Sequence, residues 1–412
     1  KNGSYEIKTY FKPKLTPGQW DHKTNMAQLR SQLSEILKDS VKHHMLSDVE
    51  VGAFLSGGVD SGYLASSSGA DQAFTVGFDE GDRYSEVNKA AKVAEKAGLK
   101  HHVKIISKQE FWDALPDVMY HMDEPLGDAS AVALYFLSKE AAGHVKVVLS
   151  GEGADELFGG YNIYREPEAL KKVAWIPFVL RRAVRKLAAK LPDVKGRDFL
   201  IRAGMKVEER FIGNAYIYRE KEKAQILKNK VTGPSTQEYL SQFYEELESE
   251  NRDSLQDMEK MQSVDLNYWL PGDILQKADK MSMAHSLEVR VPFLDKEIFN
   301  FAAKLPKEAK IAAGTTKYIF RKAVSEFLPQ ETDERKKLGF PIPIRVWLRQ
   351  NDWYQMVTDL FTSKAAEEFF RTEELLQLLK DHKNKKADNS RKIWTVLTFL
   401  IWYDRFFTTC SK

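Results

Sequence analysis

Cysteine is almost missing from the chain, since Cys410 is the only one among 412 residues. One cysteine excludes an internal disulfide framework and any zinc site built from cysteine pairs. Long hydrophobic runs are missing as well, because the most apolar stretches, VAWIPFVL and IWTVLTFLIWY, are well short of the roughly 20 residues that cross a bilayer. The start shows neither a methionine nor a signal-peptide core, so we expect it to lie inside a longer gene product. These absences favour a cytoplasmic protein without a membrane partner.

An excess of charge of one sign is also absent. The chain has 62 Lys and Arg against 59 Asp and Glu, so its overall charge gives no reason to expect a nucleic-acid partner. A basic segment does occur between residues 165 and 206, and it includes VLRRAVRKLAAK. We interpret this segment as a solvated helix face. Contact with an anionic partner and a domain interface are the alternatives.

Several catalytic signatures do not occur in the sequence. There is no GxxxxGK[ST], HExxH, GxSxG or CxxC, and GEGADE has Glu156 where the third glycine of the dinucleotide fingerprint would stand. The sequence therefore gives no support to a Walker-type phosphate loop, a metalloprotease, a serine hydrolase or a thiol redox enzyme.

The first 160 residues alternate between strand and helix patterns. Apolar residues at helical spacing predict a first helix over residues 25–41. Short apolar runs then predict strands, separated by helical patterns, at residues 49–55, 72–78, 101–106 and 145–150. Such alternation predicts an α/β fold with a parallel sheet, right-handed crossovers and helices on both faces.

Beyond residue 160 the strand signals fade and long helical patterns dominate. We therefore expect three parts: an extended segment at residues 1–20, an α/β lobe at 21–160 and a mostly helical lobe at 161–412.

A glycine-rich turn, SGGVDS, follows the first predicted strand and precedes a helix. Gly57 and Gly58 can adopt positive φ and let the backbone approach a ligand closely, and the N-terminus of the following helix favours anions. Ser56 and Ser61 add hydroxyl donors, whereas Asp60 would repel a bare phosphate but would hold a magnesium ion that bridges phosphate oxygens. A plain turn would need the glycines but neither the serines nor the aspartate. The turn therefore predicts a site for magnesium-bound phosphates.

A second glycine-rich turn, GEGADE, follows the strand predicted at residues 145–150. Because ligands of open α/β sheets bind at the carboxyl ends of the strands, both turns should open on one crevice.

Four stretches carry a resemblance to a known family. SGGVDS resembles the pyrophosphate-binding loop of PP-loop ATPases (adenine nucleotide alpha hydrolase-like), which cleave ATP between its α and β phosphates. With LSGEGADELFGGY (149–161), KADKMSMAHSLEVRVPFLD (277–295) and KKLGFPIP (336–343), the chain resembles the synthetase domain of glutamine-hydrolysing asparagine synthetases over nearly all its length.

The resemblance implies ATP and Mg²⁺ as cofactors and a set of site residues. Asp60 and Asp155 match the magnesium-binding carboxylates, so they must lie close enough to touch one cation. Glu152 matches a glutamate implicated in forming the acyl-adenylate, and it could also take a proton from the incoming ammonium; a surface carboxylate that caps a helix is the alternative. Lys317 matches a lysine that neutralises the α-phosphate and pyrophosphate, with Lys322 as a nearby competitor. The residues that match nucleotide-binding positions are Leu55, Ser56, Gly57, Gly58, Asp60, Ser61, Val76, Ser150 and Gly151.

The activity implied by the resemblance is an ATP-dependent ligation. The enzyme would adenylate the side-chain carboxylate of aspartate, release pyrophosphate and transfer ammonia to give asparagine. The family's N-terminal glutaminase domain is absent here, so we expect the chain to use free ammonia or to be one part of a longer protein. The oligomeric state stays open, with a homodimer among the options.

Other functions remain as alternatives. A related synthetase that makes a β-lactam or cyclises a peptide would share the adenylation step, and Lys280, where the family more often has arginine, leaves room for such a specialised relative. A PP-loop enzyme that modifies tRNA would use the basic segment, and a nucleotide-binding scaffold would bind ATP without turnover.

Overall fold

The computed structural model describes residues 5–16, 25–81, 84–192, 194–214, 216–251, 255–333 and 342–408. Most of the predicted motif at 336–343 lies outside these ranges, as does Cys410. The predicted N-terminal segment is described at residues 5–16, which form neither helix nor strand.

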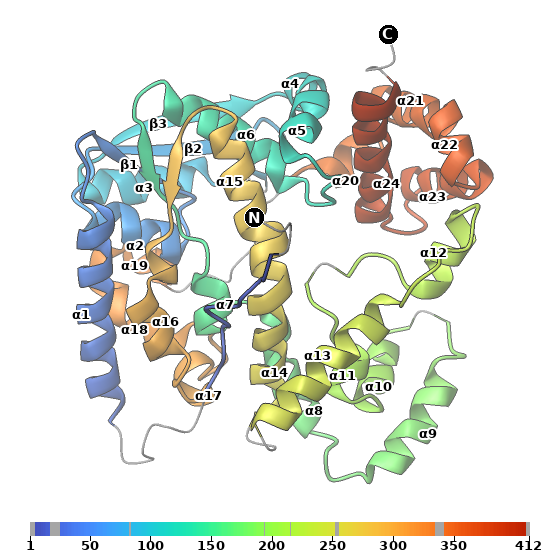
Figure 1. The fold of residues 1–412 in the computed structure, drawn as a ribbon, viewed down its shortest axis with the longest axis horizontal. Helices are drawn as coiled ribbons and strands as arrows, with labels where there is room; N and C mark the ends of the chain where they lie inside the picture. Colours follow the sequence, from blue (N-terminus) through green and yellow to red (C-terminus); the bar gives the residue numbers. More distant parts are fainter. Residues whose placement is uncertain are drawn as a thin grey trace.

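Five parallel strands form the sheet of the molecule (Figure 1). The strands are β1 (Val51–Phe54), β2 (Gln72–Phe78), β3 (Lys100–Ile106), β4 (Val147–Leu149) and β5 (Glu288–Arg290), in the order β3-β2-β1-β4-β5. The prediction of a parallel α/β fold and of the first four strands is confirmed. The strand β5 was not predicted, because its three residues are fewer than the four to eight over which alternation of apolar and polar positions indicates a strand.

The order of the strands creates a crevice between β1 and β4. The chain runs outward from β1 through β2 to β3 and then returns to the other side of β1, where Ala53 pairs with Leu149. Loops that leave neighbouring strands in opposite directions across a sheet open a crevice at the carboxyl ends of those strands, where ligands bind. Both glycine-rich turns therefore begin at this crevice.

Helices cover both faces of the sheet, as expected. Along β1, Val51 and Ala53 belong to the cores shared with α1 (Met26–His44), α2 (Val59–Ser67) and α3 (Val87–Ala97). The alternate residue Phe54 belongs to the core on the other face, which includes α5 (Leu115–Met122), α6 (Ser130–Ala142) and α15 (Gln276–Met283). The alternation follows from the two-residue period of a strand.

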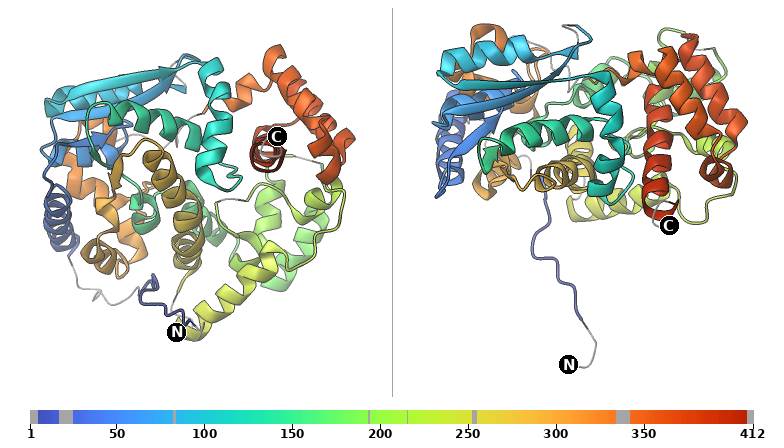
Figure 2. Two further views of the ribbon diagram at one scale, coloured as in Figure 1. Left: turned by 45° about the horizontal axis from the view of Figure 1, so that its top comes forward. Right: turned by 90° about the horizontal axis from the view of Figure 1, so that it is seen from above.

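Twelve further helical elements of the described chain lie beside the sheet in two groups (Figures 1 and 2). One group holds α8 (Glu166–Lys171), α9 (Phe178–Ala188), α10 (Arg197–Ala203), α11 (Val207–Arg210), α12 (Glu220–Ile226) and α13 (Thr236–Asn251). The other holds α20 (Ile344–Trp347), α21 (Asn351–Phe361), α22 (Lys364–Phe369), α23 (Thr372–Lys383), α24 (Ser390–Tyr403) and η6 (Asp404–Thr408).

Shorter elements lie between these helices and the strands along the chain. They are α4 (Lys108–Asp113), α7 (Ala154–Phe158), η2 (Asn162–Arg165), η4 (Pro292–Leu294), α16 (Lys296–Ala302), α17 (Lys307–Lys310), α18 (Tyr318–Val324), η5 (Ser325–Phe327) and α19 (Gln330–Asp333). Two of them, α16 and α18, pack against α1. A long helical run joins α14 (Asp257–Val264) to α15 through η3 (Asp265–Leu275), a wide π-helical stretch that contains Pro271. Wide turns of this kind occur often at functional sites.

The basic segment lies largely on α9 and its neighbours. Arg182 and Arg185 each lie 3.3 Å from the Glu209 carboxylate, so part of the positive charge is paired within the chain. The apolar side chains of Val179 and Leu180 are exposed on the same helix. Within the described ranges, every helix is too short or too polar to span a membrane.

Candidate active site

The turn after β1 depends on one glycine with positive φ. Gly57 has φ of 71°, as expected, whereas Gly58 has φ of −80° and serves as the N-cap of α2. A Cβ on Gly57 would lie 2.7 Å from Cβ of Lys89 and 2.8 Å from the amide nitrogen of Ala90. Position 57 therefore requires glycine both for its conformation and for the close packing of α3 against the turn.

The two serines of this turn first shape the loop itself. The amide of Ser56 donates to Oγ of Ser61 at 3.1 Å, and the two hydroxyl oxygens lie 3.0 Å apart. Since Gly58 has no side chain to cap α2, the first N–H groups of this nine-residue helix remain directed at the crevice. The turn thus has the form of an anion cradle.

The turn after β4 touches the turn after β1. Gly153 has φ of 89° and begins α7 as its N-cap. A Cβ on Gly151 would lie 3.2 Å from Cβ of Asp60 and 3.3 Å from the amide nitrogen of Ser61. The two glycine-rich turns therefore converge at the crevice.

One ammonium group joins the two predicted metal ligands. Nζ of Lys317 lies 2.6 Å from both carboxylate oxygens of Asp60 and 2.8 Å from Oδ1 of Asp155. The lysine side chain is 3% exposed, and its burial lowers the pKa of Lys317 against the attraction of Asp60. The two carboxylates therefore lie close enough to share a single cation, as the sequence-based assignment requires.

Two backbone features hold this lysine in place. Lys317 is the N-cap of α18 and has φ of 54°, a conformation that costs an L-residue free energy and is concentrated at functional sites. A Cβ on Gly160 would lie 1.8 Å from Oδ1 of Asp155 and 2.2 Å from Cε of Lys317. Glycine is required at position 160 because of this close packing and not because of positive φ, so the sequence alone did not single it out.

All the predicted site residues line one cavity of about 410 Å³. Oε2 of Glu152 is buried and has no hydrogen-bond partner in the described part of the chain, so Glu152 is not a surface cap. Lys322 is exposed and does not line the cavity, which removes it as a competitor of Lys317. The structure thus brings the predicted residues together, and their roles stay predictions.

A second lysine between two aspartates lines the same cavity. Nζ of Lys277 forms ion pairs with Asp128 and, at 2.9 Å, with Asp273. Burial acts to lower the pKa of Lys277, but the two carboxylates outweigh it and raise this pKa. The group of Asp128, Lys277 and Asp273 was missed, although the i,i+4 spacing of Asp273 and Lys277 is a signal that could have found part of it.

Buried polar side chains lie behind the Lys317 site. The hydroxyl of Tyr161 donates to Glu156 at 2.5 Å, and the indole N–H of Trp269 donates to that hydroxyl at 3.2 Å. Burial raises the pKa of Glu156 to about 7, despite the hydrogen bond from Tyr161. Glu156, the last residue of GEGADE, is thus a buried acid rather than part of a phosphate loop.

This geometry defines a class of protein. The parallel sheet, the turn with positive φ at the end of β1 and the neighbouring acidic turn at the end of β4 are those of a PP-loop ATPase type of nucleotide-binding domain.

The chain belongs to the asparagine synthase family, whose model matches residues 32–404. It is similar to asparagine synthetase (glutamine-hydrolysing) 1 of Bacillus subtilis, with 44% identity over 98% of this chain and 63% of the relative. A Mycobacterium tuberculosis protein that bears the same enzyme name provisionally is 40% identical over 97% of this chain and 61% of its own length. Asparagine synthetase B (glutamine-hydrolysing) of Escherichia coli is 33% identical over 39% of this chain and 31% of its own. The chain therefore spans about three fifths of the length of the first two relatives.

Proposed function

We propose that the chain is the synthetase part of a glutamine-hydrolysing asparagine synthetase. It would use ATP to adenylate the side-chain carboxylate of aspartate, release pyrophosphate, and let ammonia displace AMP to give asparagine. The observation that carries this proposal is the convergence of Asp60, Asp155 and Lys317 where the two glycine-rich turns meet.

In the first step, a carboxylate oxygen of aspartate attacks the α-phosphorus of ATP and the bond to the pyrophosphate oxygen breaks. Both reactants are anions, so the site must supply positive charge and donors where negative charge grows. Asp60 and Asp155 fit Mg²⁺, since both already contact one cation and carboxylate oxygens are the ligands that Mg²⁺ prefers. A bound Mg²⁺ would neutralise charge on the phosphates, and Lys317 and the N–H groups of α2 would stabilise the departing pyrophosphate.

In the second step, ammonia attacks the acyl carbon, the bond to AMP breaks and a proton must leave the new nitrogen. Glu152 lines the cavity with a buried oxygen that accepts no hydrogen bond from the described residues. An unpartnered buried carboxylate oxygen is suited to receive that proton. Glu152 would therefore act as the general base of amide formation.

The second acidic wall of the cavity suits an amino-acid substrate. Two carboxylates surround one ammonium in the group of Asp128, Lys277 and Asp273, so this wall carries an excess of negative charge. The Asp128 side chain is 28% exposed and faces the cavity. We assign Asp128 to binding of the α-ammonium of aspartate.

The proposal extends to the partners and the compartment. The named relatives are longer, and a glutaminase domain would supply the ammonia in the complete protein. The single cysteine suits the reducing cytoplasm. Synthetases that close a β-lactam or a peptide ring would share the first step and differ in the acceptor amine, whereas a tRNA-modifying enzyme would require the paired arginines of α9 to bind phosphates.

The test follows one oxygen atom. With ATP, ammonia and aspartate labelled with ¹⁸O in its side-chain carboxylate, we expect AMP and pyrophosphate in equal amounts and one labelled oxygen in AMP. Glutamate and other carboxylates serve as controls and should give far less AMP. Release of ADP and phosphate, or turnover with another carboxylate alone, would contradict the proposal.

A further inference from the structure

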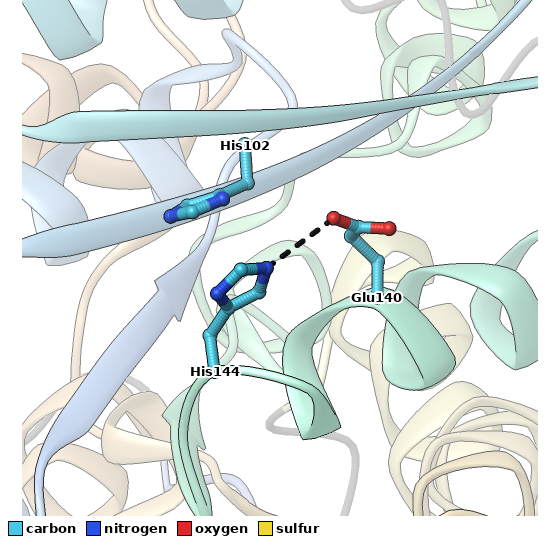
Figure 3. A group of neighbouring side chains, drawn as sticks. All are labelled: His102, Glu140 and His144. Atoms are coloured by element: carbon cyan, nitrogen blue, oxygen red, sulfur yellow. Dashed lines mark ion pairs between the residues drawn. The ribbon is translucent and has the colours of Figure 1, made fainter.

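Two histidines and a glutamate lie together outside the cavity. His102 is on β3, Glu140 is on the last turn of α6, and His144 follows that helix (Figure 3). One ligand atom from each of the three lies within 4.8 Å of the others. His102 stands near the start of β3, whereas the cavity lies where the strands end, and none of the three residues lines it. This histidine and glutamate group is thus separate from the proposed active site.

Neighbouring side chains fix which nitrogen of His102 is free. Gln72 donates from Nε2 to the carboxylate of Glu50 at 2.6 Å, which directs its amide oxygen toward Nε2 of His102 at 2.8 Å. Because an amide oxygen only accepts, Nε2 of His102 must carry the proton and Nδ1 keeps its lone pair. Metal-binding histidines commonly donate their other ring N–H to such an acceptor. Burial, followed by the charge of His144, lowers the pKa of His102, which favours the neutral ring.

The other two side chains present their ligand atoms to the same point. Nε2 of His144 lies 3.5 Å from Oε1 of Glu140, and Figure 3 shows both near the ring of His102. The two histidine rings have centroids 4.0 Å apart. Metal–ligand bonds of about 2.0–2.1 Å in a tetrahedral site separate the ligand atoms by roughly 3.3 Å, so small side-chain rotations would complete the geometry.

The surroundings suit a cation that remains open to solvent. His144 and Glu140 are 35% and 32% exposed, so an ion and its water can enter. The negative end of the helix dipole of α6 favours a cation there. The charge of Lys100, which also acts on His102, opposes it, so the affinity should be moderate.

We propose that His102, Glu140 and His144 bind a divalent first-row transition-metal ion of the Zn²⁺ type. Two imidazoles and one carboxylate suit Zn²⁺, Co²⁺, Ni²⁺ or Cu²⁺ rather than Mg²⁺ or Ca²⁺, and water fills the remaining position. The ion joins the edge strand β3 to the end of α6, so it stabilises the sheet without taking part in the reaction at the cavity.

The test uses the full chain with Cys410→Ser in every variant, so that no thiol competes for the metal. Millimolar Mg²⁺ is present throughout to occupy the carboxylates of the cavity. Zn²⁺ is titrated by calorimetry, and Co²⁺ by the visible absorption of a tetrahedral complex. We expect one ion per chain, a rise in melting temperature with Zn²⁺, and at least a tenfold weaker binding in His144→Ala and in Glu140→Gln.

Two further variants make the result specific. Gln72→Leu removes only the acceptor that orients His102 and should weaken binding about tenfold. The matched control is the double variant Asp39→Asn with His43→Ala. These two residues form an i,i+4 pair on α1 with the His43 ring 3.4 Å from the Asp39 carboxylate, and within the described residues no third metal ligand lies beside them. This control should bind Zn²⁺ as the parent does. Absence of Zn²⁺ binding in the parent, or equal affinity in the parent, His144→Ala and Glu140→Gln, would overturn the proposal.

Discussion

Two lysines line the same cavity, each between two aspartates, and the chain positions them in different ways. Lys277 and Asp273 are four residues apart on one continuous helical run, and Asp128 completes the group. Lys317 has positive φ at a helix N-cap and joins two turns that lie about a hundred residues apart in the sequence. The carboxylates raise the pKa of Lys277 despite its burial, whereas burial lowers the pKa of Lys317.

The difference indicates different roles for the two ammonium groups. Lys277 is stabilised as a cation by its own partners, so its group forms a fixed wall of the cavity. The charge of Lys317 is disfavoured by burial and would gain from further negative charge, which arriving phosphates supply. We therefore expect changes around Lys317 to reduce the rate of chemistry, and changes around Lys277 to alter binding of the amino acid.

The largest effect is expected from Asp155→Asn. The substitution keeps the size of the side chain but removes a charged oxygen that the proposed metal ion requires. We expect magnesium-dependent pyrophosphate release to fall by roughly a thousandfold, an effect equivalent to about 4 kcal/mol, while the circular dichroism spectrum stays unchanged. Pyrophosphate release close to the wild-type rate would remove Asp155 from the site.

The second largest effect is expected from Lys317→Ala. The charge that Lys317 meets grows in the transition state, so the adenylation rate should fall by roughly a hundredfold or more and ATP affinity by much less. Rapid-quench measurement of pyrophosphate separates the two effects. Lys322→Ala, on the exposed side of α18, is the matched control and should leave the rate unchanged. If only ATP binding weakens, Lys317 acts by attraction in the ground state.

Asp128→Asn should have a smaller and different effect. Loss of one carboxylate charge beside the α-ammonium should raise the KM for aspartate roughly tenfold, or about 1.4 kcal/mol, and leave the KM for ATP unchanged. Asp123→Asn is the control, since Asp123 pairs with Lys280 on an exposed surface. Equal changes in both KM values would indicate a general disturbance of the cavity.

Asp265 is a buried aspartate whose hydrogen-bond partners are neutral, unlike the aspartates beside Lys277 and Lys317. Asp265 accepts hydrogen bonds from Tyr164 at 2.6 Å and Asn214 at 2.8 Å, and burial raises the pKa of Asp265 to about 7. The folded state therefore binds a proton more tightly than the unfolded state, so this carboxyl lowers the stability of the protein as the pH rises from about 4 to 7.

Asp265→Asn removes this titration. We expect the variant to exceed the wild type in free energy of unfolding by roughly 2 kcal/mol at pH 8, and by less at pH 5. Denaturant unfolding at the two pH values measures the difference. An advantage that is equal at both pH values would show that the carboxyl does not titrate as described.

Local patterns in the sequence predicted much of the fold and part of the site. The four strands and the positive φ of Gly57 follow from residues within a few positions of each feature. Gly160 and the contact between Lys277 and Asp128 depend instead on packing between distant segments. Such contacts leave no periodic signal in the sequence. The strand β5 was missed for another reason, since its three residues are too few to show a period.

The central claim is that Asp60 and Asp155 share one metal ion when ATP is bound. A crystal structure with Mn²⁺ and a non-hydrolysable ATP analogue, analysed by anomalous scattering, tests it directly. We predict one ion about 2.1 Å from a carboxylate oxygen of each aspartate, with the ammonium of Lys317 displaced onto a phosphate. An ion held by phosphates and water alone, with Lys317 still between the two aspartates, would contradict the account.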